Sequence, residues 1–163
     1  MVAGKGWKKR QTLRQAAQKG LIMPTKRALT FERAMTRAES YVSHKKKVAW
    51  LLDKATRKAA QHYESLLASW ESFQMFIRLI RCWLANIYAA PVESILMAVG
   101  AVIYFASSFD VIPDAVPVLG LVDDVWVINS VARANLGGIS SFRNWEVFSN
   151  NRSRVVLVVI LGV

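Results

Sequence analysis

The chain has 163 residues, of which 53% are hydrophobic and 20% charged, so there is enough apolar surface for a packed core and a fully disordered chain is excluded. A single cysteine, Cys82, excludes a disulfide scaffold and fits a reducing compartment. The charge is uneven. Residues 1–81 carry 18 Lys and Arg against 5 Asp and Glu, a net charge of +13, whereas residues 82–163 carry 4 against 6, a net charge of −2.

The first segment, residues 1–25, is basic and is interrupted by glycines and a proline. This pattern predicts a flexible basic tail with a short helix from Thr12 to Lys19. The segment has no apolar run of the kind a secretory signal requires. We therefore expect this basic N-terminus to lie in a bacterial cytoplasm or on the cytoplasmic face of the inner membrane.

Residues 26–88 predict a long amphipathic helical arm, since neither Pro nor Gly occurs between Thr25 and Asn86. Apolar residues recur there at steps of three and four, which is the period of one helix face. The residues of this stripe are Val48, Leu52, Ala55, Ala59, Leu66, Trp70, Phe73, Ile77, Ile80 and Leu84. The stripe predicts a packing surface or a coiled-coil seam rather than a cofactor site.

The other face of the arm is rich in cations that could bind phosphate groups of anionic lipids or of nucleic acid. The candidates are Lys45, Lys46, Lys47, Lys54, Arg57 and Lys58. Because the arm leads directly into an apolar helix, lipid headgroups are the favoured partner and nucleic acid the alternative. A solvated helix face with no ligand remains open.

Residues 91–138 predict a helical hairpin. Pro91 opens its first helix, and the run from Ser94 to Phe109 holds no charge. From Pro91 onward this helix would reach about 28 Å, close to the hydrocarbon thickness of about 30 Å. A helix that is apolar on all sides is either a core helix or a membrane span, and we expect so short a chain to offer too little material to enclose it. Membrane embedding is therefore the favoured interpretation.

The second limb of the hairpin is predicted to follow a connector broken by prolines. Asp123 is expected to cap the N-terminus of this limb, and Gly137–Gly138 to end it. Residues 139–163 then form a C-terminal segment whose arginines favour a cytoplasmic location for this end as well. The apolar run Val155–Val163 is too short to span a membrane as a helix, and it could dip into lipid or pack on a neighbour.

The connector carries a spaced motif, Ser107-x-x-Asp110-x-x-Pro113-Asp114-x-x-Pro117-x-x-Gly120-x-x-Asp123-Asp124. This motif resembles that of the YkvA-like family, small bacterial membrane proteins with a domain of unknown function. The resemblance runs from Ile77 to Glu146 and implies helical membrane association without an established reaction. One position departs from the family, since Ser108 stands where a proline is usual, so the turn that enters the motif is expected to be less rigid.

Four carboxylates of the motif form the candidate polar cluster: Asp110, Asp114, Asp123 and Asp124. Ionisable groups at membrane depth usually face a protected interior or a cavity, where such a cluster could share a proton or hold a hard cation. The alternative is structural: the carboxylates cap a helix, accept bonds from turn amides, and are neutralised by Arg78, Arg81 or Arg133.

No catalytic arrangement is visible, because the two histidines lack zinc-site spacing and the chain has neither a phosphate-binding loop nor a nucleophile elbow. We therefore expect an all-α, non-enzymatic membrane scaffold or interaction module that needs no cofactor or metal. Its expected partners are membrane lipids and either a second copy or another membrane protein. Two alternatives stay open: a minimal ion- or proton-handling oligomer, and a soluble nucleic-acid-binding protein in which Ser94–Phe109 is a core helix.

Overall fold

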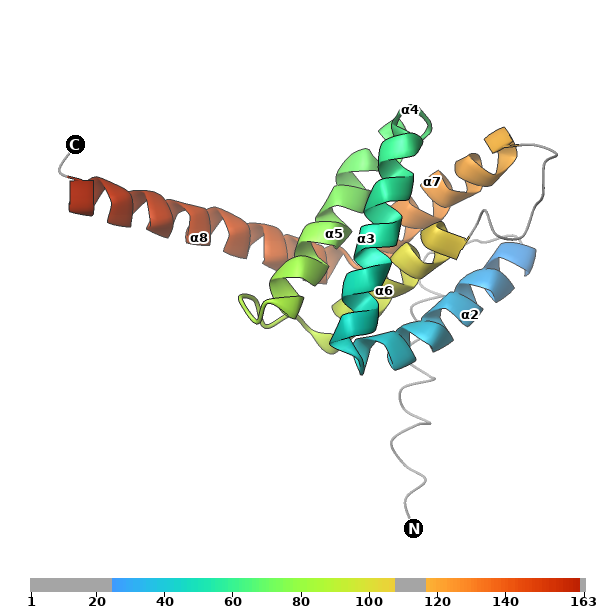
Figure 1. Cartoon of the computed structure of the whole chain (residues 1–163), viewed down its shortest axis with the longest axis horizontal. Coiled ribbons are helices and arrows are strands. Elements are labelled where there is room, and N and C mark those ends of the chain that lie inside the picture. The colour runs from blue at the N-terminus through green and yellow to red at the C-terminus, as the bar shows by residue number, and fades with distance from the viewer. Residues whose placement is uncertain (1–24, 108–116, 162–163) are drawn as a thin grey trace, which may run out of the picture.

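A computed structural model describes the backbone of residues 25–107 and 117–161, and the side chains of residues 31–107 and 124–150. Every regular element within these ranges is helical, which confirms the predicted all-α class. The predicted basic tail lies almost wholly outside the described residues. The elements are α2 (Thr25–Val42), α3 (Lys45–Gln61), α4 (Tyr63–Leu66), the 3-10 helix η1 (Leu67–Ser69), α5 (Trp70–Leu84), α6 (Val92–Ser107), α7 (Pro117–Ala134) and α8 (Leu136–Leu161) (Figure 1).

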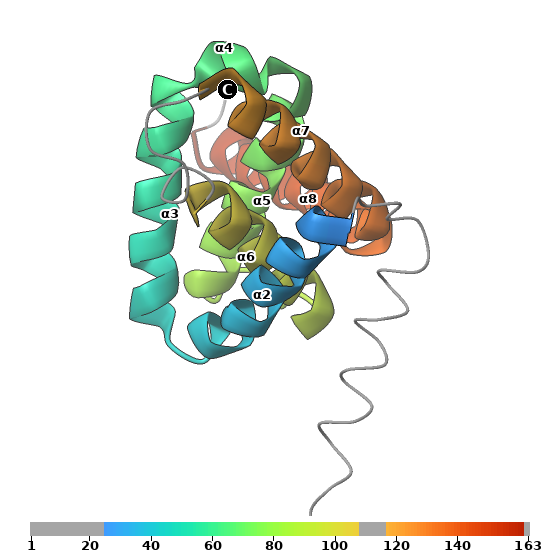
Figure 2. The same ribbon diagram turned by 90° about the vertical axis from the view of Figure 1, so that its right-hand side faces the viewer.

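Helix α6 is the centre of the fold. It begins where predicted, as the carbonyl of Pro91 accepts a hydrogen bond from the amide of Ile95 at 3.1 Å. Helices α2, α3, α5 and α7 pack around it (Figure 2). Every residue from Ser94 to Ala106 except Met97 is buried. The expectation that the chain is too short to enclose an apolar helix is therefore wrong, because the arm itself folds around α6.

The predicted arm is helical but not continuous. The chain leaves helical geometry at His44, with φ −133° and ψ 89°, and again at His62, with φ −121° and ψ 29°. These breaks let successive segments of the arm return to α6. In the segments after His44, the apolar stripe supplies the packed surface, and most of its members are buried: Val48, Leu52, Ala55, Ala59, Leu66, Phe73, Ile77 and Ile80. The stripe is a packing surface, as predicted, and burying it against α6 removes more apolar area from water than a straight arm would.

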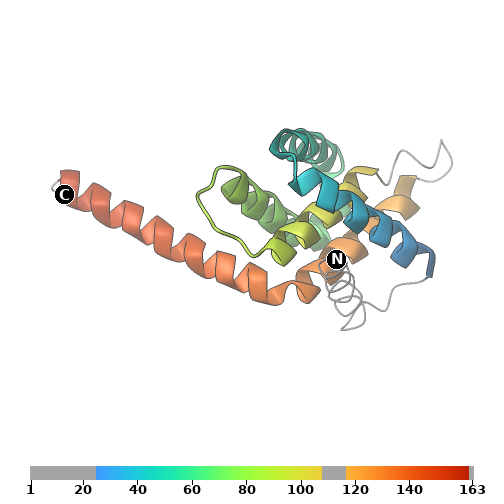
Figure 3. The same cartoon turned by 90° about the horizontal axis from the view of Figure 1, so that it is seen from below.

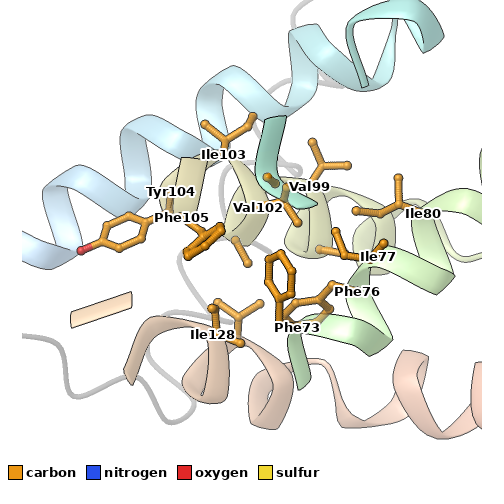
Figure 4. Packing of buried hydrophobic residues seen from close by; sticks show 14 of the residues in the cluster. Phe73, Phe76, Ile77, Ile80, Val99, Val102, Ile103, Tyr104, Phe105 and Ile128 are labelled. Carbon is orange, nitrogen blue, oxygen red and sulfur yellow. The ribbon is translucent and has the colours of Figure 1, made fainter. Parts of the chain in front are cut away.

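Aromatic rings of α5 and α6 meet at the C-terminal half of α6 (Figure 4). Phe73 and Phe105 contact each other edge to face with ring centroids 5.0 Å apart, and Ile128 of α7 is also fully buried. On the other side, α2 crosses α6 at Gly100, where a Cβ would overlap the Met35 side chain and lie 3.7 Å from the Met35 Cα. A side chain at this position would therefore require the flexible Met35 side chain to move, while the backbone of α2 would stay at an ordinary contact distance.

The limb after the motif differs from the prediction at both ends. Helix α7 begins at Pro117, a favourable first helical position, and not after Asp123. Gly137–Gly138 does not end a helix but lies in the first turn of α8, with Asn135 alone separating α7 from α8. The Asn135 side-chain amide donates to the Ser94 carbonyl at 3.3 Å, and a Cβ at Gly138 would lie 2.6 Å from the Asn135 Oδ1. The glycine therefore serves close packing of α8 on the start of α6.

Helix α8 is 26 residues long, and its described side-chain contacts with the body come from its first half. Phe142 is fully buried there and lies in a ring cluster with Tyr88 and Trp145, at centroid distances of 5.1 and 5.7 Å. The second half of the helix extends away from the other helices (Figures 1 and 3).

Candidate functional site

The motif residues fall mostly in the part of the chain that is least described. Asp110, Pro113 and Asp114 lie outside the described residues, so their predicted clustering stays a prediction. Ser107 is the last residue of α6, while Pro117, Gly120 and Asp123 belong to the first two turns of α7. The structure thus places the two ends of the motif on the central helix and on one of the helices that cover it.

Asp124 is the one motif carboxylate whose side chain is described, and it is fully buried at 0% exposure. Because α7 begins at Pro117, Asp123 and Asp124 lie in its second turn, and the prediction that Asp123 is the N-cap is wrong. Asp124 shares the inward face of α7 with Val127, Ile128 and Val131. A carboxylate enclosed in this way must be compensated by hydrogen bonds or by protonation, so its immediate surroundings are constrained.

Among the arginines expected to neutralise the motif carboxylates, Arg78 pairs with another carboxylate in the described part of the chain. Arg78 Nε donates to Glu146 Oε1 at 2.9 Å, which joins α5 to α8. Arg81 and Arg133 are exposed on the surface. Arg143 of α8 forms a second bridge to Glu71 of α5 at 2.7 Å, so ion pairing here holds α8 in place.

The six predicted phosphate-binding cations divide into two groups, and the first group serves helix ends. Lys45 Nζ donates to Asn86 Oδ1 at 2.7 Å and lies 3.4 Å from the Leu84 carbonyl oxygen. Lys58 Nζ donates to the Phe105 carbonyl in the last turns of α6 and lies 4.5 Å from the centroid of that ring. Each ammonium group therefore sits at the negative end of a helix dipole and stabilises the fold.

The end of α5 shows why a cation is favourable there. Asn86 has a left-handed φ of 56°, a conformation that asparagine tolerates better than most residues. The Asn86 amide donates to the Trp83 carbonyl at 3.1 Å and the Ile87 amide to the Cys82 carbonyl at 2.9 Å, which is the Schellman pattern. Lys45 completes this cap and also lies 5.6 Å from the Trp83 ring centroid.

The second group faces outward from α3 together with an exposed tryptophan. Trp50 is 59% exposed, and Lys54 Nζ lies 5.8 Å from its ring centroid. The other cations of this group are exposed and lie one turn before Trp50 or two turns after it: Lys46, Lys47 and Arg57. Arg57 is paired with Asp53. We call Lys46, Lys47, Trp50, Lys54 and Arg57 the α3 face. Trp50 was not among the site residues predicted from the sequence, although its position off the apolar stripe of α3 indicated that it would be exposed.

A shallow open groove of about 610 Å³ borders the α3 face, between α3 and the end of α5. Its walls are mostly apolar, with Arg57 contributed by α3 and Arg81 by α5. The lining residues are Ala49, Leu52, Asp53, Thr56, Arg57, Ala60, Arg81, Leu84 and Ala85. A concave site with an apolar floor and two guanidinium groups suits an amphiphile with an anionic head.

Two further candidate chemistries find little support in the described part of the chain. Burial raises the pKa of the Cys82 thiol, and the nearby Glu146 carboxylate raises it further against the opposing effect of Arg78. The thiol is therefore protonated near neutral pH and is a poor nucleophile. No three His, Cys, Asp or Glu side chains among the described residues are grouped so that they could hold a metal ion.

Comparison with known proteins agrees with the motif. A family model described as "Protein of unknown function (DUF1232)" matches residues 94–129. The "Uncharacterized membrane protein YkvA" of Bacillus subtilis (strain 168) is 26% identical over 104 residues, which are 63% of this chain and 98% of that protein. No solved structure matches the chain. The segment that the family model matches contains nearly all of α6, the motif and most of α7. The α3 face and α8 lie outside that segment.

Across residues 25–107 and 117–161, no helix is both long enough and apolar enough to cross a bilayer.

Proposed function

We propose that this chain is a non-enzymatic membrane-associated interaction module that binds anionic lipid headgroups through the α3 face. Its residues 94–129 match a family of unknown function, and the chain is similar to a protein named a membrane protein. The relative in Bacillus subtilis is named a membrane protein, which supports a membrane address for this chain. The observation that carries the proposal is the exposure of Trp50 among four cations on one helix face.

The physical basis is the complementarity of this face to a membrane surface. Each Lys or Arg near an anionic leaflet contributes about 1 kcal/mol. A tryptophan ring prefers the headgroup level, where its apolar body and its polar N–H are both accommodated. The adjacent groove, with Arg57 and Arg81 on its walls, gives a lipid phosphate a place to lie.

The stronger form of this function is insertion of α6 and α7 as a hairpin. In the folded body α2, α3 and α5 cover α6, so insertion of the α6–α7 hairpin requires these three helices to move off it. The rings of Phe73 and Phe76, now fully buried, would then lose their partners. Extraction of native membranes distinguishes the two forms, because a surface-bound protein is released by alkaline carbonate and an inserted hairpin only by detergent.

Ion or proton handling remains a second candidate because Asp124 is a fully enclosed carboxylate on α7, next to the rest of the motif in sequence. Replacing Asp110 and Asp114 with Asn should then abolish ion flux in vesicles and leave membrane association unchanged. Unchanged flux would rule this candidate out.

The lipid proposal is tested by sedimenting the full chain with phosphatidylcholine vesicles, with and without phosphatidylglycerol. The double variant Lys46→Gln/Lys47→Gln should weaken binding to anionic vesicles about 30-fold, since two contacts of about 1 kcal/mol are lost. The matched control is Arg33→Gln/Arg37→Gln, which removes the same charge from exposed positions of α2.

Equal losses in the two double variants would show that net charge alone drives binding and would contradict a specific α3 face. Tight binding to duplex DNA without vesicle binding would favour the nucleic-acid alternative, because a duplex offers the same phosphates. Trp50→Ala separates the contributions further. It should weaken vesicle binding without changing the slope of affinity against salt, since no charge is removed.

A further inference from the structure

We infer that the last seven described residues of α8, Val155–Leu161, enter the acyl-chain region of a bilayer, so that this protein holds its membrane by a hydrophobic contact as well as by the α3 face. We call these residues the α8 tip. The inference rests on the proposed membrane function and adds a second contact, of different chemistry, to it.

Helix α8 is attached to the body near its N-terminal end. Its first half is fixed to the body by the buried ring of Phe142 and by two ion pairs to α5, Arg78–Glu146 and Arg143–Glu71. Its second half extends away from the other helices, so the α8 tip is held at a distance from the body (Figures 1 and 3). Helix geometry carries the chain from Leu136 to Leu161 without a break. An anchored helix of this kind presents its far end to a partner outside the fold.

The composition of the α8 tip is Val-Val-Leu-Val-Val-Ile-Leu, in which every position is apolar. Whatever the rotation of the helix about its axis, no face of it is polar. A second copy of the chain would cover only one stripe of the helix and leave the remaining faces in water. A lipid environment covers all faces at once, so the composition favours acyl chains over a protein seam.

The order of residues along the second half of α8 points the same way. Arg152 and Arg154 lie within the turn before the tip, where their positive charges suit the level of lipid phosphates. The sequence therefore changes from cationic to wholly apolar at the place where a helix entering a membrane passes from headgroups to acyl chains.

The single cysteine makes a direct test possible. In a Cys82→Ser background, Val158→Cys is labelled with a fluorophore whose emission shifts to the blue in an apolar environment. The matched control is Ser141→Cys, an exposed position in the body-proximal half of α8. With phosphatidylcholine–phosphatidylglycerol vesicles, the label at position 158 should shift to the blue and become accessible to quenchers in the acyl chains, while the label at position 141 should not.

Salt separates this inference from the proposed function. In about 1 M salt the Debye length is about 3 Å, so binding through the α3 face is suppressed and the blue shift at position 158 should persist at high vesicle concentration. Leu157→Asp, placed outside the packed body, should abolish the salt-resistant binding and keep the salt-sensitive part.

Three other outcomes would contradict the inference about the α8 tip, and one of them would also contradict the proposed function. Vesicle binding by sedimentation with no shift at position 158 would overturn the inference and leave the proposed function standing. Absence of vesicle binding by any variant would overturn both. A blue shift without vesicles that grows with protein concentration would show that the α8 tip packs on a second copy, and would also overturn the inference.

Discussion

Helix α6 and the α8 tip are both apolar on all sides, yet their surroundings in the fold are opposite. The four helices packed around α6 bury Ile95, Val99 and Phe105 to 1% exposure or less. The α8 tip extends away from the other described helices (Figure 3). An apolar run therefore does not by itself decide between core and membrane. What decides is whether the rest of the chain carries complementary apolar faces and can fold back to present them.

The contrast between α6 and the α8 tip is tested most directly by truncating one large side chain in each region. Phe105→Ala should lower the free energy of unfolding by about 3–5 kcal/mol, because it removes a fully buried ring and leaves a cavity. Leu157→Ala in the α8 tip should change it by less than about 0.5 kcal/mol. Urea denaturation followed by circular dichroism measures both. Equal effects would mean that the α8 tip is part of the folded core.

The attachment of α8 to the core is tested by two neighbouring glycines. Gly138→Ala should destabilise the fold by about 1–3 kcal/mol, since the added Cβ would crowd Ser94 and Asn135. Gly137→Ala meets nothing within 4 Å and should stabilise the helix by about 0.5–1 kcal/mol. Thermal unfolding of the two variants gives the sign directly. A loss of stability in both would show that α8 tolerates no side chain in this turn.

A smaller effect is expected at Cys82, which lies on α5 near the ion pair to α8. Because burial raises the pKa of its thiol above the ordinary value, the thiolate fraction at pH 8 is small and alkylation by iodoacetamide should be slow. The rate should rise as the pH approaches that raised pKa. Glu146→Gln should speed the reaction modestly, since it removes the second cause of the upward shift.

The control for Cys82 is the same alkylation in denaturant, where the thiol should react at the rate of an ordinary cysteine. The folded thiol binds its proton more tightly than the unfolded one, so this group stabilises the fold fully below the unfolded pKa. That contribution is lost as the pH rises through the folded pKa. If the folded and unfolded proteins react equally fast at pH 8, the thiol is not shielded by the fold.

Local features of the chain were readable in advance because they depend on near neighbours. The absence of Pro and Gly over most of residues 26–88 and the steps of three and four in the apolar stripe predicted helix and a buried face. The start of α6 after Pro91 followed in the same way. The motif from Ser107 to Asp124 lies within residues 94–129, the segment that matches a family model of unknown function.

Other features depend on contacts between residues far apart in sequence and were decided only by the tertiary structure. The breaks at His44 and His62 carry no strong local signal, but they let the arm cover α6. Lys45 and Lys58 look like surface cations in sequence, and 41 and 47 residues further on they meet the ends of other helices. The glycine pair at the start of α8 resembled a helix stop because its neighbour across the fold, Ser94, is invisible to a local pattern.

Periodicity, charge and motif spacing are local properties, so a helical chain, a basic first half and a motif similar to that of the YkvA-like family could all be predicted without the fold. Only the tertiary structure decided that α6 is enclosed, that Trp50 is exposed among cations, and that α8 stands away from the body. These depend on which apolar faces find each other, and burial of apolar surface is non-directional, so several arrangements satisfy the same local pattern until all helices are packed together.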